Sequence, residues 1–385
     1  MVSRDRAPLT RAVAAAAVAP LLLLAACGGG DDEPGLTPPP TTSPVEGGDS
    51  TGDAAATSTG SNPVQDGFTS AAGGNDAATQ TTTEPEGPKE ITIGAAGDLL
   101  LHAPVIRNAQ ANAGGEGYDF VPMFADVTDL LSDNDLTICH METPISADNT
   151  NLTVPRVLIF NSPREIADAV VAAGYDGCDF ASNHTWDQGL SGLAETQQVL
   201  EEAGLQYAGP VADESEAGHY ATYEVDDVTV AQFGYTYTIY NSGQPTTDIP
   251  PDAPWLGDYL WPVIGAEGII ADAEAAKDDG ADFVVVSMHW GNEYWTDPTD
   301  QQRELAAELL ESDAVDLILG THVHVIQPCE KINDKYVIYG LGNFLSNQSP
   351  DTTRGKLRKE TQEGMIARFH LTKDADGTVT SQMEF

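Results

Sequence analysis

Six short polar motifs, each placed directly after an apolar, strand-like run, constrain the fold of this chain more than any other feature of its sequence. This alternation is typical of α/β proteins, in which functional side chains gather at the carboxyl ends of strands. The motifs are Gly97-Asp98, His140-Met141-Glu142-Thr143-Pro144, Ser182-Asn183-His184, Met288-His289-Trp290-Gly291, Gly320-Thr321-His322-Val323-His324 and Leu341-Gly342-Asn343-Phe344. We therefore expect residues from distant stretches to meet in one pocket.

The first five motifs carry Asp, Glu, Asn and His, whose oxygen and imidazole nitrogen atoms bind borderline divalent cations. The predicted metal ligands are Asp98, Glu142, Asn183, His289, His322 and His324. Glu142 could bridge two ions, and His322 and His324, two apart on a segment predicted to be extended, would point their rings to one side. For any single histidine a structural role is the more frequent one. The ordered set instead predicts two divalent ions (Mn, Fe or Zn) about 3.5–4 Å apart.

Five further residues are predicted to surround these ligands. His184 could donate a proton to a leaving oxygen, which makes it the candidate catalytic acid. Asp187 and Glu293 are interpreted as groups that orient histidines, with loop hydrogen bonding as the alternative. His102 could bind metal or merely line the cleft, and His140, on the same strand face as the predicted bridging glutamate, could contact the site or fill space.

Several side chains are candidates for contacts with a substrate. Trp186, Trp290 and Tyr294 could form the wall of a cleft, or they could pack in the core or at its rim. Asn343 belongs to the last motif and is a further candidate. The densest basic run, residues 354–359, could contact a polyanion near the cleft, or it could be a solvated loop.

The first 89 residues are predicted to lie outside the folded body. Residues 1–27 combine arginines, a short apolar run and Leu24-Ala25-Ala26-Cys27, which resembles a bacterial lipobox, so that cleavage would precede a lipid-modified Cys27. An ordinary signal peptide with a chance cysteine is the alternative. Residues 28–89, rich in Gly, Pro, Ser and Thr, are predicted to be a disordered acidic tether. Residues 90–385 form the predicted domain, held at the extracellular face of the cell membrane.

Charge and cysteine content exclude other classes of protein. The net charge is −43 with only 17 basic residues, which argues against nucleic-acid binding through a basic face. Cys139, Cys178 and Cys329 show no spacing typical of a zinc knuckle. One disulfide at most could form among them, and we expect instead that they are small buried apolar residues.

Helical and strand-like periodicities alternate along the body, which predicts an α/β fold with mixed sheets. Strands are expected at residues 90–97, 136–141, 177–181, 283–287, 315–319 and 336–341, with hairpins at 220–234 and 365–383. Helices are expected at 121–131, from Ser162-Pro163 to 173, and at 190–203, 265–277 and 299–311. Residues 241–261 read as a loop.

The motifs resemble those of the CapA-type poly-γ-glutamate capsule biosynthesis proteins, within the calcineurin-like metallophosphoesterase superfamily, over roughly residues 91–348. They are Gly97-Asp98, Met141-Glu142-Thr143-Pro144, Asn183-His184 with Asp187 and Gly189, His289-Trp290-Gly291 with Glu293-Tyr294, Gly320-Thr321-His322-Val323-His324, and Leu341-Gly342-Asn343-Phe344. The resemblance implies a four-layer α/β/β/α sandwich with two mixed sheets, the metallo-dependent phosphatase-like fold.

The resemblance also implies a distribution of ligands over the two metals. Asp98 and His324 would bind one metal, while Asn183, His289 and His322 would bind the other. Glu142 would replace the usual bridging aspartate, and His184 would be the catalytic acid. The Asp-x-His motif common in the superfamily is absent, because three leucines follow Asp98.

Taken together, the sequence predicts an envelope-tethered, metal-dependent hydrolase or transferase of capsule or poly-γ-glutamate synthesis. Its substrate would be an anionic surface polymer or a phosphoester, and membrane-bound synthesis or export proteins would be its partners. The alternative is a non-catalytic subunit that binds the polymer or assists export and assembly on the same fold.

Overall fold

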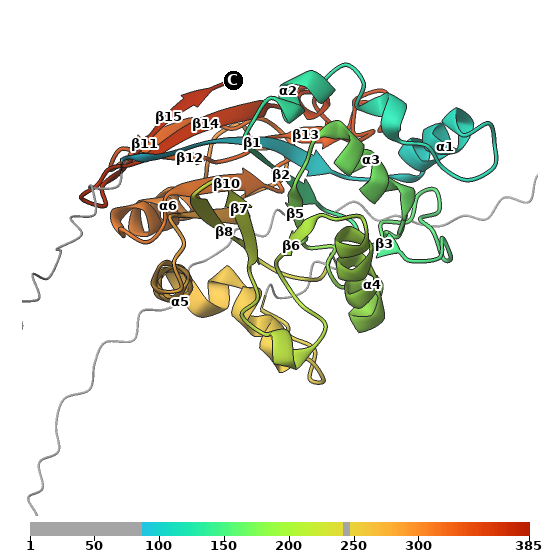
Figure 1. Ribbon diagram of the computed structural model, residues 1–385. Coiled ribbons are helices and arrows are strands. Elements are labelled where there is room, and N and C mark those ends of the chain that lie inside the picture. Colours follow the sequence, from blue (N-terminus) through green and yellow to red (C-terminus); the bar gives the residue numbers. More distant parts are fainter. Residues whose placement is uncertain (1–86, 242–246) are drawn as a thin grey trace, which may run out of the picture. The chain divides into compact units, whose positions relative to one another are not determined.

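A computed structural model describes residues 87–241 and 247–385, as strands that alternate with helices (Figure 1). The predicted signal peptide with Cys27, and the predicted tether as far as residue 86, lie outside the described residues. Within the described ranges, no helix is long and apolar enough to cross a membrane.

The larger sheet has seven strands and mixed directions. Its order is β15-β14-β1-β2-β5-β6, and β13 also pairs with β1. The strands are β1 (Lys89–Leu99), β2 (Leu136–Met141), β5 (Gly177–Asp179), β6 (Gln206–Ala208), β13 (Asn343–Leu345), β14 (Ile366–Lys373) and β15 (Val379–Glu384). β1, β2, β5 and β6 run parallel, whereas β14 and β15 are antiparallel. The predicted strand at 136–141 and the C-terminal hairpin are confirmed.

The second sheet has six strands in the order β11-β12-β10-β9-β8-β7. Its strands are β7 (Ala221–Val225), β8 (Val228–Thr236), β9 (Phe283–His289), β10 (Leu317–Thr321), β11 (Cys329–Ile332) and β12 (Lys335–Ile338). β8, β9, β10 and β12 are parallel, and the edge strands β7 and β11 are antiparallel. A short ribbon of β3 (Ile145–Ser146) and β4 (Ser162–Pro163) lies apart from both sheets.

Six α-helices and four 3-10 helices connect the described strands. The α-helices are α1 (Ala103–Asn112), α2 (Thr128–Ser132), α3 (Glu165–Ala173), α4 (Gly189–Glu202), α5 (Trp261–Asp278) and α6 (Asp300–Glu311). The 3-10 helices are η1 (Val121–Met123), η2 (Glu214–Glu216), η3 (Pro254–Tyr259) and η4 (Lys359–Gln362). α6 starts with a capping box between Thr299 and Gln302, and α3 ends at Gly174, whose φ of 99° favours glycine.

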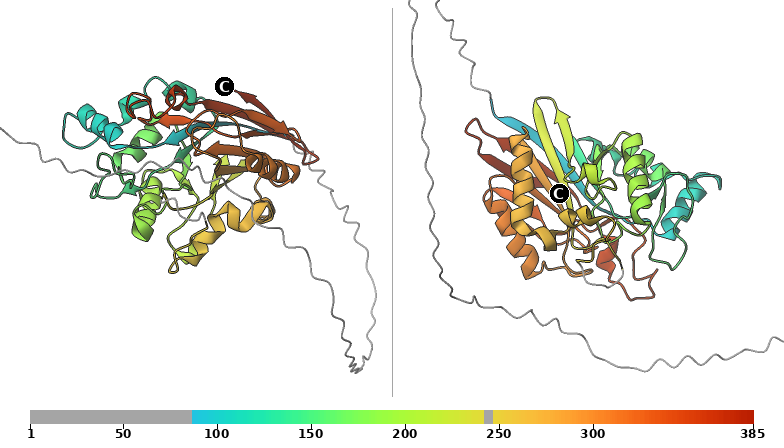
Figure 2. Two further views of the ribbon diagram at one scale, coloured as in Figure 1. Left: turned by 180° about the vertical axis from the view of Figure 1, so that it is seen from behind. Right: turned by 90° about the horizontal axis from the view of Figure 1, so that it is seen from below.

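Three buried apolar clusters hold these elements together. One joins the two sheets, with Ile93 and Leu136 from the first and Val285 from the second. A second cluster packs α1, α3 and α4 on the first sheet, and a third packs α5 and α6 on the second sheet. The right-hand view of Figure 2 shows α5 and α6 on the opposite side of the structure from α1 and α4. Both sheets therefore have buried faces, and the mixed α/β class is as predicted.

Several local predictions were wrong. Residues 121–131 form no continuous helix but η1 and then α2, because Val121 and Leu130, which would face the core, are 48% and 56% exposed. Ser162 and Pro163 do not cap α3. They pair with β3 instead, and the helix starts at Glu165.

The cysteines follow their prediction only in part, because Cys139 and Cys178 are buried as expected but are not unpaired. Cys139 of β2 and Cys178 of β5 are partners in register, with a Cα–Cα distance of 4.5 Å, and form a disulfide. This separation is within the range that a disulfide spans. Cys329 is exposed rather than buried. The sequence could not show this pairing because it depends on which two strands are neighbours.

Candidate metal centre

The carboxyl ends of parallel strands from both sheets supply the side chains of the site. Asp98 on β1 lies in register with His140 on β2 and with Asn343 on β13. In the other sheet His289 ends β9 beside Thr321, the last residue of β10. The strand ends thus bring the motifs together because neighbouring parallel strands end at the same sheet edge.

Gly97 is required for the approach of β1 to the last motif. A Cβ atom at this position would lie 1.8 Å from the carbonyl oxygen of Gly342. That carbonyl accepts a hydrogen bond from the Asp98 amide at 2.9 Å. Only glycine permits such a contact, so Gly97 fixes the position of the carboxylate that follows it.

Asp98, His324 and Asn343 form the first part of the centre. His324 Nδ1 lies 2.9 Å from Asp98 Oδ2 and 3.2 Å from Asn343 Oδ1. Burial alone would lower the pKa of His324, but the charge of Glu142 and the hydrogen bond to Asp98 outweigh it and raise its pKa to about 10. In the absence of metal this imidazole is therefore a cation held between carboxylates.

Glu142 is the least compensated group of the centre. It is completely buried, and neither carboxylate oxygen has a hydrogen-bond partner. The nearest basic atom is His324 Nε2, 3.6 Å from Oε1. Burial raises the pKa of this carboxyl to about 7, against the charge of His324. A buried carboxylate without a partner is costly, and a divalent cation would supply what the protein does not, so these residues fit a metal.

His289 and Asn183 form a second part, supported by His140. His289 Nε2 lies 3.0 Å from Asn183 Oδ1, while its Nδ1 lies 3.1 Å from His140 Nε2. On its other side, His140 Nδ1 lies 2.7 Å from Asp179 Oδ1. Burial would lower the pKa of His140, but the charge of Asp179 raises it to about 9. Burial and the neighbouring His322 keep the pKa of His289 well below its usual value, so that this ring is neutral, as a ligand must be.

His322 and His324 do not lie on an extended segment, and that prediction was wrong. Both adopt left-handed backbone conformations, with φ of 85° and 56°. Such strain in non-glycine residues clusters at functional sites. The two turns still bring the rings to one side, with centroids 6.1 Å apart. Burial holds the pKa of His322 well below its usual value, and its Nδ1 has no partner.

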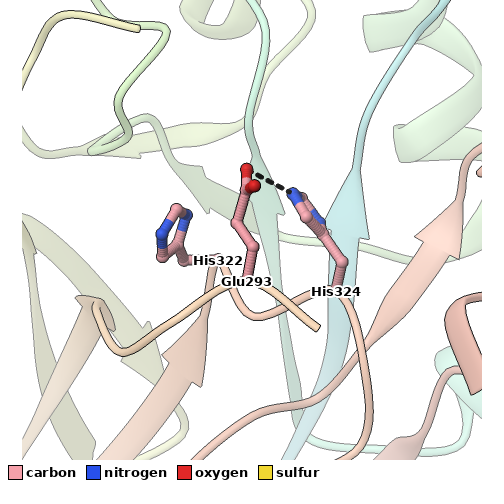
Figure 3. A group of neighbouring side chains, drawn as sticks. All are labelled: Glu293, His322 and His324. Atoms are coloured by element: carbon pink, nitrogen blue, oxygen red, sulfur yellow. Dashed lines mark ion pairs between the residues drawn. The ribbon is translucent and has the colours of Figure 1, made fainter. Parts of the chain in front are cut away.

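Glu293 extends toward these two imidazoles from the loop after β9. Figure 3 shows its carboxylate between the rings of His322 and His324, and an oxygen lies 3.9 Å from His324 Nε2. The three residues could hold a metal ion, since one donor atom from each lies within 4.8 Å of the others. Asp98, His140 and Glu142 form a second such group. Glu293, interpreted on the sequence as a group that orients histidines, thus lies where it could be a direct donor, and His140 contacts the site, one of the two roles that the sequence allowed.

His184 lies beside this centre on the loop after β5. Its Nδ1 is 2.8 Å from Asp187 Oδ2, and the ring of Phe160 contacts it edge-on at 4.6 Å between centroids. Asp187 also accepts a hydrogen bond from the Phe160 amide at 2.6 Å. The ring is therefore held in one orientation, with Nε2 as the nitrogen that can exchange a proton.

His102 does not join either group of donors. Its ring packs edge-on against Phe160, with centroids 5.2 Å apart, and its Nδ1 has no hydrogen-bond partner. Burial, followed by the charge of His324, lowers the pKa of His102 to about 4. The ring is therefore neutral and lines the approach to the centre.

The predicted contact residues lie in different environments. Trp290 is fully buried, and its indole N–H donates to the Tyr339 carbonyl. It therefore packs in the core, one of the alternatives that the sequence allowed. Trp186 packs against Tyr240 with ring centroids 6.2 Å apart, at the edge of the core. Tyr294 lies closer to the centre, with its ring 5.9 Å from that of His324. Asn343 contacts His324 rather than a cleft.

Three nearby residues had no place in the sequence-based site. Tyr237 lies with its ring 4.7 Å from that of His322, and Asn241 accepts from Asn183 Nδ2 at 3.3 Å. Asp179 holds His140, as described above. Tyr237 follows a predicted strand, which was a usable signal. Asn241 and Asp179 carried none, because their roles depend on the folding of loops and on strand order.

The match to a protein family agrees with this geometry. A family model described as bacterial capsule synthesis protein PGA_cap matches residues 92–348. The chain belongs to this family. The resemblance inferred from the motifs is thereby confirmed, and the matched region contains every side chain of the centre described above.

Two relatives of this PGA_cap chain carry CapA names. The PGA biosynthesis protein CapA of Bacillus subtilis (strain 168) is 26% identical over 282 residues, which cover 73% of this chain and 68% of that protein. The capsule biosynthesis protein CapA of Bacillus anthracis is 27% identical over 285 residues, with 74% and 64% covered. The chain thus spans about two thirds of the length of these relatives.

Among solved structures, the sulfate thiohydrolase SoxB of Thermus thermophilus aligns with 73% of this chain and 41% of its own. The sequence identity is 15% and the TM-score is 0.36. A score this low does not establish a shared fold.

Proposed function

We propose that this PGA_cap chain is a metal-dependent hydrolase or transferase of capsule or poly-γ-glutamate synthesis, with two divalent ions (Mn, Fe or Zn) at the candidate centre. The names of the CapA relatives support the process. The arrangement of three buried clusters around two mixed sheets supports the four-layer α/β/β/α sandwich that the motifs imply.

One observation carries the proposal. Glu142 is buried without a hydrogen-bond partner for either oxygen, and Asp98, His140 and His324 lie close to it. A buried carboxylate that lacks hydrogen bonds is costly, and a bound divalent cation would offset this cost. We assign Glu142 as the group between the two metal ions, with Asp98 and His324 on one side and Asn183, His289 and His322 on the other.

When bound, the metal pair would polarise a phosphoryl or acyl oxygen of the substrate. The protein itself would orient the proton donor. Asp187 fixes Nδ1 of His184, so that Nε2 can protonate the leaving oxygen. Phe160 packs against the same ring and excludes water from one edge. Asp179 and His140 would hold His289 in place, because a ligand histidine needs its second nitrogen fixed.

The direct test is metal analysis of the purified protein together with hydrolysis of bis(p-nitrophenyl) phosphate. We expect about two transition-metal ions per chain and turnover that a chelator abolishes. A protein that stays metal-free in metal-replete medium would refute the proposal.

A non-catalytic role in polymer binding or export is the second candidate. The observation that favours it is the first motif, in which Leu99, Leu100 and Leu101 are buried in place of a histidine ligand. Metal binding without turnover of any phosphoester or γ-glutamyl substrate would support this alternative.

We also propose that the chain is anchored through Cys27 to the extracellular face of the cell membrane, near synthesis or export partners. The lipobox-like sequence supports this. Cys27→Ser should move the protein from the membrane fraction to the medium, and an unchanged distribution would contradict the anchor.

A further inference from the structure

A hollow of about 300 Å³ opens beside the metal centre, between the start of α1 and two loops. Its wall includes His102 and Arg107, residues 153–158 with Arg156, and residues 347–353 with Asn347 and Gln348. The apolar part of this wall is exposed, since Val157 and Leu158 are 40% and 58% accessible. The hollow thus combines guanidinium, amide and aliphatic groups.

No acidic side chain lines this hollow, although the chain carries 60 aspartates and glutamates. Three other hollows of the described structure are lined by acidic side chains. One is lined by Glu201, Glu202, Asp213 and Glu216, another by four acidic residues around Lys335, and the third by Asp258 and Asp272. The hollow beside the centre is therefore the one suited to an anion.

The basic side chains of the described residues fall into three groups. Seven take part in ion pairs: Lys89, Arg164, Lys277, Arg303, Lys331, Arg368 and Lys373. Lys335 instead donates to backbone carbonyls. Six have no ion-pair partner within the described ranges: Arg107, Arg156, Arg354, Lys356, Arg358 and Lys359. Two of these six line the hollow, and the other four follow directly after Thr353, which also lines it.

The hollow is connected to the centre by two contacts. His102 lines it and packs on Phe160, which in turn packs on His184. On the other wall, Gln348 accepts from Asn343 Nδ2 at 3.1 Å, and Asn343 contacts His324. The wall of the hollow is therefore in contact with side chains of the metal centre on two sides.

We propose that this hollow is a subsite for a polycarboxylate chain, in which Arg107 and Arg156 bind carboxylates of a γ-linked glutamyl polymer while a neighbouring unit occupies the centre. Guanidinium groups bind carboxylates in a bidentate manner. Val157 and Leu158 would contact the methylene groups between carboxylates, and Asn347 and Gln348 would pair with the amide backbone. The inference rests on the proposed function and adds the substrate's recognition element.

The test is fluorescence anisotropy of a labelled γ-linked glutamate oligomer with the full, metal-loaded chain. R107Q/R156Q should weaken binding about tenfold, because each lost guanidinium removes a charge-assisted contact. R303Q/K331Q is the matched control, since it removes the same charge from surface ion pairs elsewhere. Its affinity should stay within about twofold of the wild type. Both arginines of the hollow are exposed, so their replacement should leave the fold intact. The single variants R107Q and R156Q provide a second test of binding.

Equal affinities of the two double variants would overturn the subsite. So would equal binding of an oligomer whose carboxylates are amidated. Tighter binding of polyphosphate, lost on R107Q/R156Q, would assign the hollow to phosphate and also overturn the proposal. Metal content and phosphodiester turnover are measured on the same preparations. A failure of the proposed function appears in those two measurements, whereas a failure of the subsite appears only in the anisotropy.

Discussion

The two ends of strands β9 and β10 accommodate buried carboxylates in opposite ways. At the amino end, Asp316 accepts from Lys277 at 2.6 Å and from the Val284 amide at 2.8 Å. Asp282 pairs there with Lys89 and Lys373. At the carboxyl end, Glu142 lies 3.6 Å from His324, which follows β10, and neither of its oxygens has a hydrogen-bond partner. The protein can supply lysines to a buried carboxylate, and it does so only where no metal is proposed.

The largest effect on activity is expected at the carboxyl end of the strands, where Glu142 has no hydrogen-bond partner. Glu142→Gln keeps the size of the side chain but removes the charge that would hold the metal pair. Turnover should fall about a thousandfold, comparable to the loss of a main electrostatic contributor. Metal content should fall with it, as measured by mass spectrometry of the purified variant. Glu304→Gln, on the exposed face of α6, is the control and should change neither quantity.

At the amino end of β9 and β10, a substitution should lower the stability of the protein rather than its activity. Asp316→Ala leaves Lys277 without its counter-ion, and the variant should lose about 3 kcal/mol of unfolding free energy in urea. Asp313→Asn, at a nearby exposed position, should cost less than about 0.5 kcal/mol. An Asp316→Ala variant as stable as the wild type would show that this ion pair has no stabilising role.

An intermediate effect is expected at His184, which is beside the centre but outside the donor set. His184→Gln should lower turnover about a hundredfold, the usual contribution of a general acid, while the metal content stays unchanged. His370→Gln on β14 is the matched control far from the site. Loss of metal together with turnover would make His184 a ligand instead of an acid.

The smallest effect concerns pH. Because burial raises the pKa of Glu142 to about 7, the metal-free carboxyl keeps its proton below that pH and must release it on binding. The Glu142 proton alone should therefore lower the metal affinity about tenfold for each pH unit below 7, in addition to the loss caused by the ligand His324, which is also protonated there. The affinity should continue to rise above 7, since His140 and His324 also lose protons, with pKa values of about 9 and 10. Calorimetry in buffers of different ionisation enthalpy measures the released protons, and pH-independent affinity would contradict this ionisation scheme.

Much of the fold and of the site at the carboxyl ends of the strands could be predicted from the sequence. The strand ends at Asp98, Glu142 and His289 could be predicted because an apolar run precedes each polar residue. Two hairpins, β7–β8 and β14–β15, were also predicted, since their turns are local. Such features depend on neighbouring residues and so can be seen in a single chain.

The remaining features depend on long-range placement. The Cys139–Cys178 disulfide and the Asp179–His140 contact follow from the pairing of β2 with β5. The left-handed turns at His322 and His324 could not be predicted from residue type, because histidine adopts that conformation at only a minority of positions. Glu293 reaches the centre because its loop is held against the segment after β10, where the Tyr294 amide donates to the Val323 carbonyl at 2.7 Å.

If the residues at the carboxyl ends of the strands hold two metal ions, anomalous scattering from crystals of the metal-loaded protein will locate both. We predict two peaks, both within coordination distance of Glu142, with Asp98 and His324 at one and Asn183, His289 and His322 at the other. A metal-replete crystal with no peak at Glu142, and with its carboxylate in the same unpartnered position, would contradict this prediction.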